Sequence, residues 1–319
     1  MANTLYNRKR ATVVNTGFGT NAGIYGGRLV NKDGQPNIRK HGVPFLESFS
    51  WFHSMLSISR GKFFLIILFF YVLVNLLFTF TYFLIGVEHL TGLDPHSNGE
   101  RFMEAFFFST QTFTTVGYGR IAPVGFLMNA VASFQALIGL LSFAVATGLM
   151  YGRFSRPKAY LKFSQHALIA PFRDASGLMI RLAPYKNTTL TEVEARMTVL
   201  IVNEQDGKLS NNFYSLDLEY STINTLTLSW TLVHPITEES PFYGLNREDF
   251  ANTKGEIIVF IKAFDDMFSN TVVTRTSYTF REVAYGAKFI PMFHRDDALD
   301  TTVLDLEKLN SWEIHPLPA

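Results

Sequence analysis

Two long runs without a charged residue constrain the fold of this chain most strongly. The first runs from Phe63 to Val87 and the second from Ile121 to Gly152. Each is longer than the roughly 20 apolar residues that a helix needs to cross the hydrocarbon core of a bilayer. Charged residues make up only 17% of the chain, and 31 residues are Phe. Burial in lipid explains this composition, with a large Phe-rich core as the alternative, so we predict two transmembrane helices.

The charges that flank the two runs predict the orientation of the chain. The segment between the runs carries Glu88, Asp94, Glu100 and Glu104. Lys and Arg gather on the other side, at Arg60, Lys62, Arg153, Arg156, Lys158 and Lys162. Because positive residues stay on the cytoplasmic side, we expect a multi-pass protein of the cell membrane with both termini in the cytoplasm.

A short apolar segment between the runs carries the chemistry. Residues 102–113 are apolar but too few to span the membrane, and Thr114-Thr115-Val116-Gly117-Tyr118-Gly119 follows them. Irregular backbone at membrane depth is tolerated where it is buried in protein or lines a watery path. The segment therefore predicts a re-entrant pore helix that ends in a filter loop.

The loop sequence indicates the ion. Four T-V-G-Y-G loops can replace the hydration shell of K⁺ with rings of backbone carbonyls. We expect Thr115, Val116, Gly117 and Tyr118 to bind K⁺, and the glycines at 117 and 119 to adopt backbone angles closed to other residues. Tyr118 is expected to brace the loop against neighbouring pore helices. The sequence thus predicts a potassium-selective channel that conducts K⁺ and needs no cofactor.

The chain changes character on either side of the two runs. Residues 45–58 repeat apolar side chains at helical spacing, which predicts an amphipathic helix along the inner membrane surface, although an ordinary core helix has the same pattern. Asp33-Gly34 predicts a tight turn. After Pro157, alternation at 193–201 and short β-prone segments at 177–183, 213–220, 225–233, 256–264 and 271–280 predict an all-β sandwich.

Several segments together resemble the inward-rectifier potassium channel family, most closely its prokaryotic branch. They are Arg28 to Asn37, the basic segment Arg153 to Lys158, His234-Pro235-Ile236-Thr237-Glu238-Glu239-Ser240-Pro241-Phe242-Tyr243, Arg275 to Tyr278, and Gly286 to Phe289. The resemblance covers roughly residues 28 to 295. It implies a homotetramer, an immunoglobulin-like cytoplasmic domain, and an N-terminal strand laid against that domain.

The expected fold class is an α+β membrane protein, and the resemblance divides it into five parts. These are an N-terminal cytoplasmic segment (1–44), an amphipathic interfacial helix (45–60), a two-helix pore domain with a re-entrant pore helix (61–152), a cytoplasmic β-sandwich (153–295) and a C-terminal tail (296–319).

Two departures from the family pattern bear on conduction. Family members usually carry Glu in the pore helix where this chain has Gln111, so a charge pair between that position and Arg120 behind the filter is in doubt. The inner-helix position that often carries Asp or Glu matches Gln135, so the resemblance implies that Gln135 lines the pore cavity. Four neutral side chains there predict weak block by polyamines or Mg²⁺, hence weak rectification, with a polar helix–helix contact as the alternative role for Gln135.

The resemblance also suggests positions for gating and lipid binding. Gly139 could permit the inner helix to bend or merely allow close packing. Tyr151 matches the family position whose bulky ring narrows the pore at the helix crossing. Arg153, Arg156 and Lys158 lie where anionic lipid headgroups, including phosphoinositides, are expected, although simple positive-inside anchoring explains them too.

Other functions fit the sequence less well. A two-span channel with a nucleotide-binding domain needs a G-x-G-x-x-G motif, and none follows residue 152. A membrane-anchored β-sandwich sensor explains the spans but not the filter loop. Scattered histidines without catalytic or metal-ligand spacing argue against an enzyme, and the absence of a basic stripe argues against nucleic-acid binding. With no cysteine, disulfides and thiolate metal sites are excluded.

Overall fold

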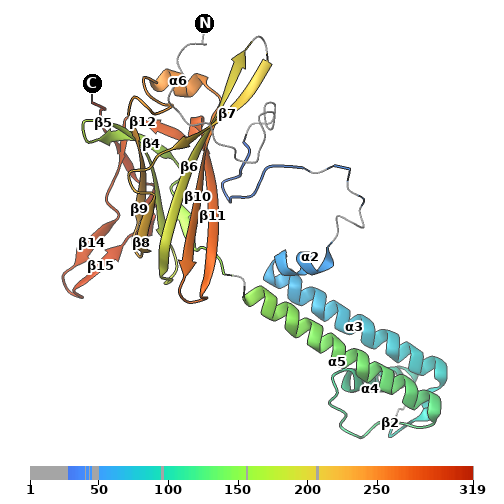
Figure 1. The fold of residues 1–319 in the computed structure, drawn as a ribbon. Helices are drawn as coiled ribbons and strands as arrows, with labels where there is room; N and C mark the ends of the chain where they lie inside the picture. The colour runs from blue at the N-terminus through green and yellow to red at the C-terminus, as the bar shows by residue number, and fades with distance from the viewer. Residues whose placement is uncertain are drawn as a thin grey trace. The chain divides into compact units, whose positions relative to one another are not determined.

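The chain forms two compact units. The computed structural model describes residues 28–39, 41–42, 44, 50–94, 97–155, 157–205 and 208–318. One unit, the helical unit, contains the described residues between 41 and 155, and the other, the β unit, contains 28–39 together with the residues from 157 onward. Figure 1 draws both units, and each is described here by itself.

The helical unit contains two helices long and apolar enough to cross a membrane. They are α3 (Arg60–Ile85), with a mean hydropathy of 2.6, and α5 (Phe126–Phe154), with 1.8. Both predicted spans are therefore confirmed as helices. The expected amphipathic helix appears as α2 (Trp51–Ser57), and the expected residues 45–49 lie outside the described part of the chain.

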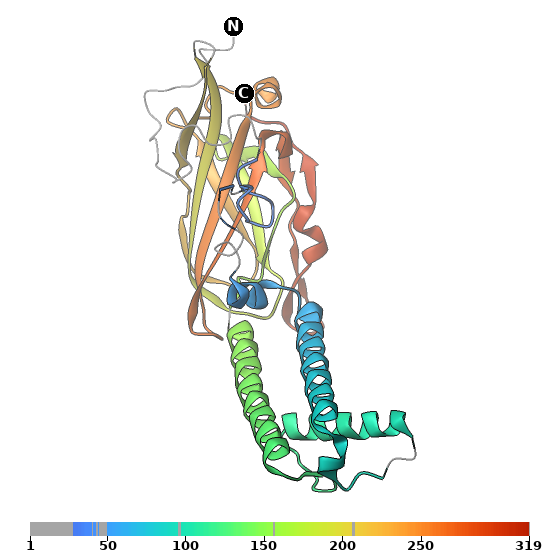
Figure 2. The same cartoon turned by 90° about the vertical axis from the view of Figure 1, so that its right-hand side faces the viewer.

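The pore helix is α4 (Asn98–Phe113), which begins four residues before its predicted start. Ser97 caps it, because its hydroxyl accepts a hydrogen bond from the Glu100 backbone N–H at 3.2 Å. Figure 2 shows α4 lying across α3, with one end beside α5. A 3₁₀ turn, η1 (Val87–His89), and the paired strands β1 (Leu90–Thr91) and β2 (Ala122–Pro123) complete this end.

Gln135 lies where these three helices meet, and its side chain is 0% exposed. Its amide nitrogen donates to the Ser109 hydroxyl at 2.6 Å and to the Ser109 carbonyl at 3.0 Å, and its oxygen accepts from the Tyr82 hydroxyl. Ser109 in turn donates to the Asn75 side chain at 2.9 Å. The prediction that Gln135 lines the pore cavity is wrong, because the face of α5 that carries Gln135 packs against α3 and α4 of the same chain. The alternative role, a polar helix–helix contact, is the one the structure shows.

The β unit is a two-layer sandwich. One sheet has the strand order β11-β10-β6-β7, with β8 also paired to β6, and the other has β12-β4-β5-β3, with β9 also paired to β5. The strands of the first sheet are β6 (Leu190–Gln205), β7 (Lys208–Leu216), β8 (Thr222–Leu226), β10 (Gly255–Asp265) and β11 (Asn270–Thr279). Those of the second are β3 (Leu161–Phe163), β4 (Ala167–Phe172), β5 (Ala175–Pro184), β9 (Trp230–Ile236) and β12 (Val283–Tyr285).

The core between the sheets explains the sequence pattern. Val193, Ala195, Met197 and Val199 of β6 are buried, whereas Glu192, Glu194, Arg196 and Thr198 between them are more exposed. The buried set packs with Leu178, Ile180 and Leu182 of β5 in one cluster. The predicted β-sandwich is therefore confirmed. The expected strand 225–233 is in fact the end of β8, a turn and the start of β9.

The C-terminal residues belong to the β unit rather than to a tail. Residues 296–319, expected to be a tail, contain β15 (Thr301–Leu304), the 3₁₀ turn η3 (Leu306–Asn310) and β16 (Trp312–Ile314). β15 pairs with β14 (Phe293–Asp296), and β16 pairs with β13 (Ala287–Phe289). Leu309 is buried with Ala183 and Met292. Sequence-local patterns missed these strands because each is only three or four residues long and is held by its partner. The short α6 (Arg247–Asn252) and η2 (Phe280–Glu282) complete the unit.

The N-terminal segment lies on the β unit, as the resemblance implies. The buried Glu256 carboxylate accepts from the backbone N–H groups of Leu29 (2.6 Å) and Val30 (3.0 Å). The predicted turn at Asp33-Gly34 is present, with Val30 bridged to Pro36 across it. Gly34 has a φ of +82° and sits so close to the Arg275 backbone that a Cβ would clash.

His234 is a buried titratable group in the β unit. Its Nδ1 donates to the Asp217 carbonyl at 2.7 Å, so its Nε2 accepts from the Ser240 hydroxyl at 2.8 Å. The Ser240 oxygen also accepts from the Phe242 backbone N–H at 3.1 Å. The ring is therefore held in its neutral form, and burial lowers the pKa of His234 below 6.5.

We expect acid to destabilise the β unit through His234. Because its pKa is lower in the folded than in the unfolded state, the unfolded chain takes up the proton more readily. The free energy of unfolding should therefore fall as pH drops below about 6.5, and the fall should end at the folded-state pKa. Thermal unfolding of the full chain between pH 5 and 8 measures this. His234→Asn should flatten the profile, whereas substitution of the exposed His294 should not.

Gln135 is expected to matter for stability rather than for block. Gln135→Leu removes the acceptor of the Tyr82 hydroxyl and the amide that donates to the Ser109 hydroxyl and carbonyl. Interhelical hydrogen bonds in membranes contribute about 0.6–2 kcal/mol each. The midpoint of thermal unfolding in detergent should fall for Gln135→Leu and further for Gln135→Glu, which buries a charge. Ser133→Ala, at an exposed position of α5, is the control. Unchanged stability of both Gln135 variants would contradict the assigned role.

Candidate functional site

The filter loop follows the last residue of α4 and has an alternating backbone. Thr115, Gly117 and Gly119 have φ values of +60°, +52° and +84°, whereas Val116 and Tyr118 between them are not in this region. In an extended chain successive carbonyls point to opposite sides. A reversal of φ at every second residue instead allows successive carbonyls to face the same side, which is the arrangement that a row of cation sites needs.

Glycine is required here for its backbone angles and not for space. Apart from the adjoining residues, a Cβ added at Gly117 or Gly119 would meet no atom within 4 Å in the part of the chain that the structure describes. A left-handed φ nevertheless costs an L-residue energy. The positive φ required at every second residue of the loop therefore explains why positions 117 and 119 are glycine. Thr115 adopts a positive φ as well, although it is not glycine.

Hydrogen bonds attach the filter loop to the last turn of the pore helix. The Gln111 carbonyl accepts from the backbone N–H groups of Val116 (2.9 Å) and Gly117 (3.4 Å), and Thr115 donates to the Thr112 carbonyl at 3.1 Å. These bonds turn the amides of the loop back toward α4 and leave its carbonyls unpaired with the helix. Gln111 thus supports the filter through its backbone.

Arg120 pairs with a residue that the sequence analysis did not select. Its guanidinium forms an ion pair with Glu104 of α4, and the second oxygen of Glu104 accepts from the Asp94 backbone N–H at 3.1 Å. Glu104 lies seven residues before Gln111, two turns along the same helix face. The sequence put a charge pair between position 111 and Arg120 in doubt, and in the structure Arg120 pairs instead with Glu104, nearer the start of α4. The helical period was the signal that could have identified Glu104 as the partner.

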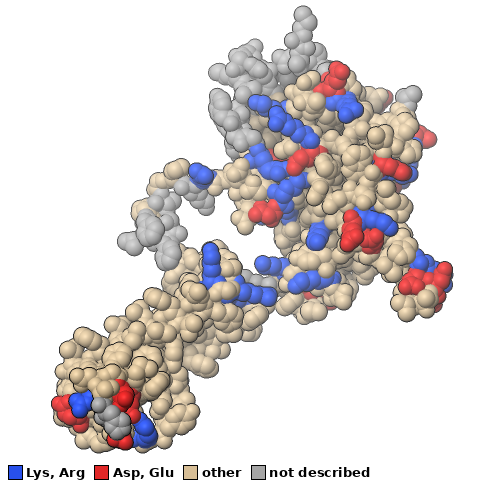
Figure 3. All heavy atoms as spheres, turned by 180° about the vertical axis from the view of Figure 1, so that it is seen from behind, with Lys and Arg blue, Asp and Glu red and all other residues tan. Residues whose placement is uncertain are grey.

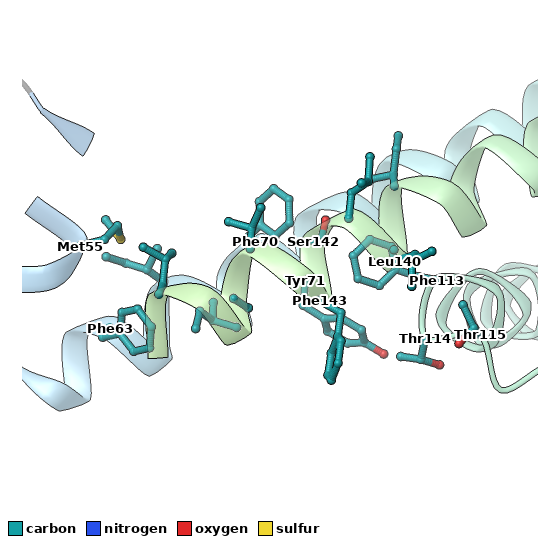
Figure 4. Close-up of a pocket in the computed structure, with 18 of the residues that line it drawn as sticks. Met55, Phe63, Phe70, Tyr71, Phe113, Thr114, Thr115, Leu140, Ser142 and Phe143 are labelled. Atoms are coloured by element: carbon teal, nitrogen blue, oxygen red, sulfur yellow. The ribbon is translucent and has the colours of Figure 1, made fainter. Parts of the chain in front are cut away.

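An apolar cavity of about 720 Å³ extends between α3 and α5 to the inner end of the loop. Figure 4 shows Thr114 and Thr115 at one end of it and Met55 and Phe63 at the other. Phe143 and Ser142 of α5 and Tyr71 of α3 lie between these ends. Phe143, which the sequence analysis did not select, is 73% exposed in the single chain.

Gly139 lies at a close contact between helices. A Cβ at this position would be 1.9 Å from the Phe113 carbonyl oxygen, at the end of α4. The structure thus supplies the close-packing reason for this glycine, and helix α5 is continuous through it. Bending at Gly139 stays a prediction. Tyr151, twelve residues further along α5, is 74% exposed.

The three cations chosen as lipid ligands are placed differently. Arg153 is half-buried and donates to the Met55 and Ile58 carbonyls, the second at 2.8 Å. Lys158 is exposed in the β unit, and Arg156 lies outside the described residues. In Figure 3 charged residues lie at the two ends of the helical unit, and its middle is uncharged.

Comparison with known proteins agrees with this geometry. The sequence model of the inward rectifier potassium channel C-terminal domain matches residues 161–318, and an ion channel model matches residues 66–156. The inward rectifier potassium channel Kirbac3.1 of Paramagnetospirillum magnetotacticum is 35% identical over 272 residues, which cover 83% of this chain and 89% of that protein.

Animal relatives are more distant. The G protein-activated inward rectifier potassium channel 2 of Pongo abelii is 26% identical over 302 residues, covering 85% of this chain and 69% of that protein. The G protein-activated inward rectifier potassium channel 1 of Homo sapiens is 29% identical over 214 residues, covering 63% and 42%. Two spans, a filter loop with an alternating backbone and these matches lead to one conclusion: the chain belongs to the inward rectifier potassium channel family.

Proposed function

We propose that four copies of this chain surround one pore and that the loop 115–119 selects K⁺ over Na⁺. The observation that carries the proposal is the alternation of φ at Thr115, Gly117 and Gly119 at the end of a re-entrant helix. The carbonyls of one loop can face only part of an ion, so several copies must meet around an axis to replace its hydration shell.

Exposed apolar side chains support assembly of several copies. Tyr118 is 80% exposed and Val116 52% in the single chain. A side of α5 turned away from Gln135 is also uncovered in the single chain, and it includes Leu140, Phe143 and Tyr151. Contact between copies covers the Tyr118 rings beside the filter. The side of α5 that carries Leu140, Phe143 and Tyr151 lines the ion pathway on the cytoplasmic side of the filter.

The finer features of the proposal follow from the charges. With Lys and Arg on the side of α2 and acidic residues beside α4, both termini are cytoplasmic. Helix α5 contains no Asp or Glu, so it offers no carboxylate to polyamines or Mg²⁺, and rectification is weak. Lys158, with Arg156, attracts anionic lipid headgroups such as phosphoinositides by about 1 kcal/mol per residue. Tyr151 narrows the inner mouth, and Gly139 is retained as a candidate hinge.

Rubidium uptake into liposomes tests the function. Purified protein should take up ⁸⁶Rb⁺ against excess Na⁺ outside, and Ba²⁺ should block it. Gly117→Ala should abolish the selective uptake, because a Cβ disfavours the left-handed φ that aligns the carbonyls. Gly99→Ala, at an ordinary helical glycine in α4, is the matched control. Equal uptake of Na⁺ and Rb⁺ by the unaltered protein would contradict the proposal.

Tyr151 is expected to limit flux. Four bulky rings at the inner mouth can close a pore by dewetting it. Tyr151→Ala should therefore raise the initial rate of ⁸⁶Rb⁺ uptake, and Tyr151→Phe should leave it near the unaltered value. An unchanged rate for Tyr151→Ala would show that the narrowing lies elsewhere.

A further inference from the structure

Helix α2 ends without a cation of its own. The last carbonyls of a helix lack intrahelical partners and carry partial negative charge, so Lys or Arg in the last turn is stabilising. The seven residues Trp51–Ser57 include neither. Arg153, about 95 residues further along the chain, takes this role.

The contacts of Arg153 form a closed set, which we call the Arg153 clasp. One guanidinium nitrogen donates to the Met55 carbonyl and another to the Ile58 carbonyl at 2.8 Å. The guanidinium carbon lies 4.5 Å from the centre of the Phe63 ring, which is itself buried. Beside it, a Cβ on Gly152 would stand 3.3 Å from Leu56. The planar fork of Arg suits two acceptors at once, and the ring adds a cation–π contact.

The clasp lies on a particular face of α5. Arg153 follows Gln135 by eighteen residues, about five helical turns, so both lie on the face that packs against the rest of the helical unit. Tyr151 precedes Arg153 by two residues, about 200° around the helix, and lies on the opposite, exposed face. A pull from the clasp on the inner end of α5 is therefore directed away from the side that Tyr151 faces.

We propose that Arg153 is a positioning residue that holds the inner mouth of the pore open. Its guanidinium ties the last turn of α5 to the corner between α2 and α3 and so keeps Tyr151 back from the pore axis. This inference rests on the proposed function, in which Tyr151 lines the inner mouth. It assigns the charge of Arg153 to two backbone carbonyls of its own chain and not to a lipid headgroup.

Charge-conserving substitution separates the clasp from lipid attraction. Arg153→Lys keeps the positive charge but cannot span two carbonyls with a rigid fork. We expect Arg153→Lys and Arg153→Gln both to lower the initial ⁸⁶Rb⁺ uptake by about tenfold, the change that losing one hydrogen bond from a charged donor gives in a two-state equilibrium. Arg60→Gln, which removes an exposed cation at the start of α3, should leave uptake unchanged.

A double variant tests whether Arg153 acts through Tyr151. With Ala at position 151 the inner mouth stays wide wherever α5 lies, so Arg153→Lys combined with Tyr151→Ala should take up ⁸⁶Rb⁺ as fast as Tyr151→Ala alone. A merely structural defect would persist in the double variant. Size-exclusion chromatography of each variant in detergent verifies that it assembles.

The outcomes distinguish this inference from the proposed function. Selective uptake by the unaltered protein, with unaltered uptake by Arg153→Lys and loss only in Arg153→Gln, overturns the clasp in favour of charge. A double variant as slow as Arg153→Lys alone also overturns it. Absence of selective uptake by the unaltered protein overturns the proposed function itself, and the clasp with it. The inference predicts neither a lipid requirement for Arg153 nor rescue by lysine.

Discussion

Backbone at membrane depth has no water to hydrogen-bond its polar groups, so the helical unit must supply partners for them from within the protein. The filter loop is irregular, so its N–H groups must find partners while its carbonyls stay free for ions. The Gln111 carbonyl takes two of these N–H groups. Because the loop hangs from the last turn of α4, everything that fixes α4 also fixes the filter. The Gln135 cluster does so where α3, α4 and α5 meet, and the Glu104–Arg120 ion pair does so nearer the start of α4.

Local patterns in the sequence predicted the helices and the filter loop of the helical unit, because each of these elements was determined by the residues inside it. Two uncharged runs suffice for two spans, and a run of T-V-G-Y-G after a short apolar helix suffices for a filter loop. The rotation of α5 about its own axis was not determined in this way. Its apolar residues surround the helix, so no stripe indicates which face meets α3 and α4. Nothing in the pattern of α5 could therefore correct the family match that assigned Gln135 to the pore cavity, and Phe143 on the cavity side was not selected.

Polar residues misled the sequence analysis for a related reason. A basic residue at the end of a span fits a lipid headgroup and the carbonyls of a nearby helix end equally well, since both carry negative charge. Only the position of α2, distant in sequence, decides between them for Arg153. The same holds for Arg120, whose partner depends on how the loop returns past the start of α4. Pairings of this kind depend on tertiary structure and cannot be read from a single sequence.

Helix α5 thus has two faces with different demands. Along one face, Gln135, Gly139 and Arg153 each make a contact with little freedom: a buried hydrogen-bond cluster, a backbone approach too close for a Cβ, and a forked cation on two carbonyls. The other face, which includes Leu140 and Tyr151, is exposed in the single chain. The Gly139 contact joins the first of these faces to Phe113, the last residue of α4, and the filter loop begins within two residues of Phe113. The face of α5 that holds the start of the filter loop is therefore also the face that carries Arg153 at the inner end of the helix.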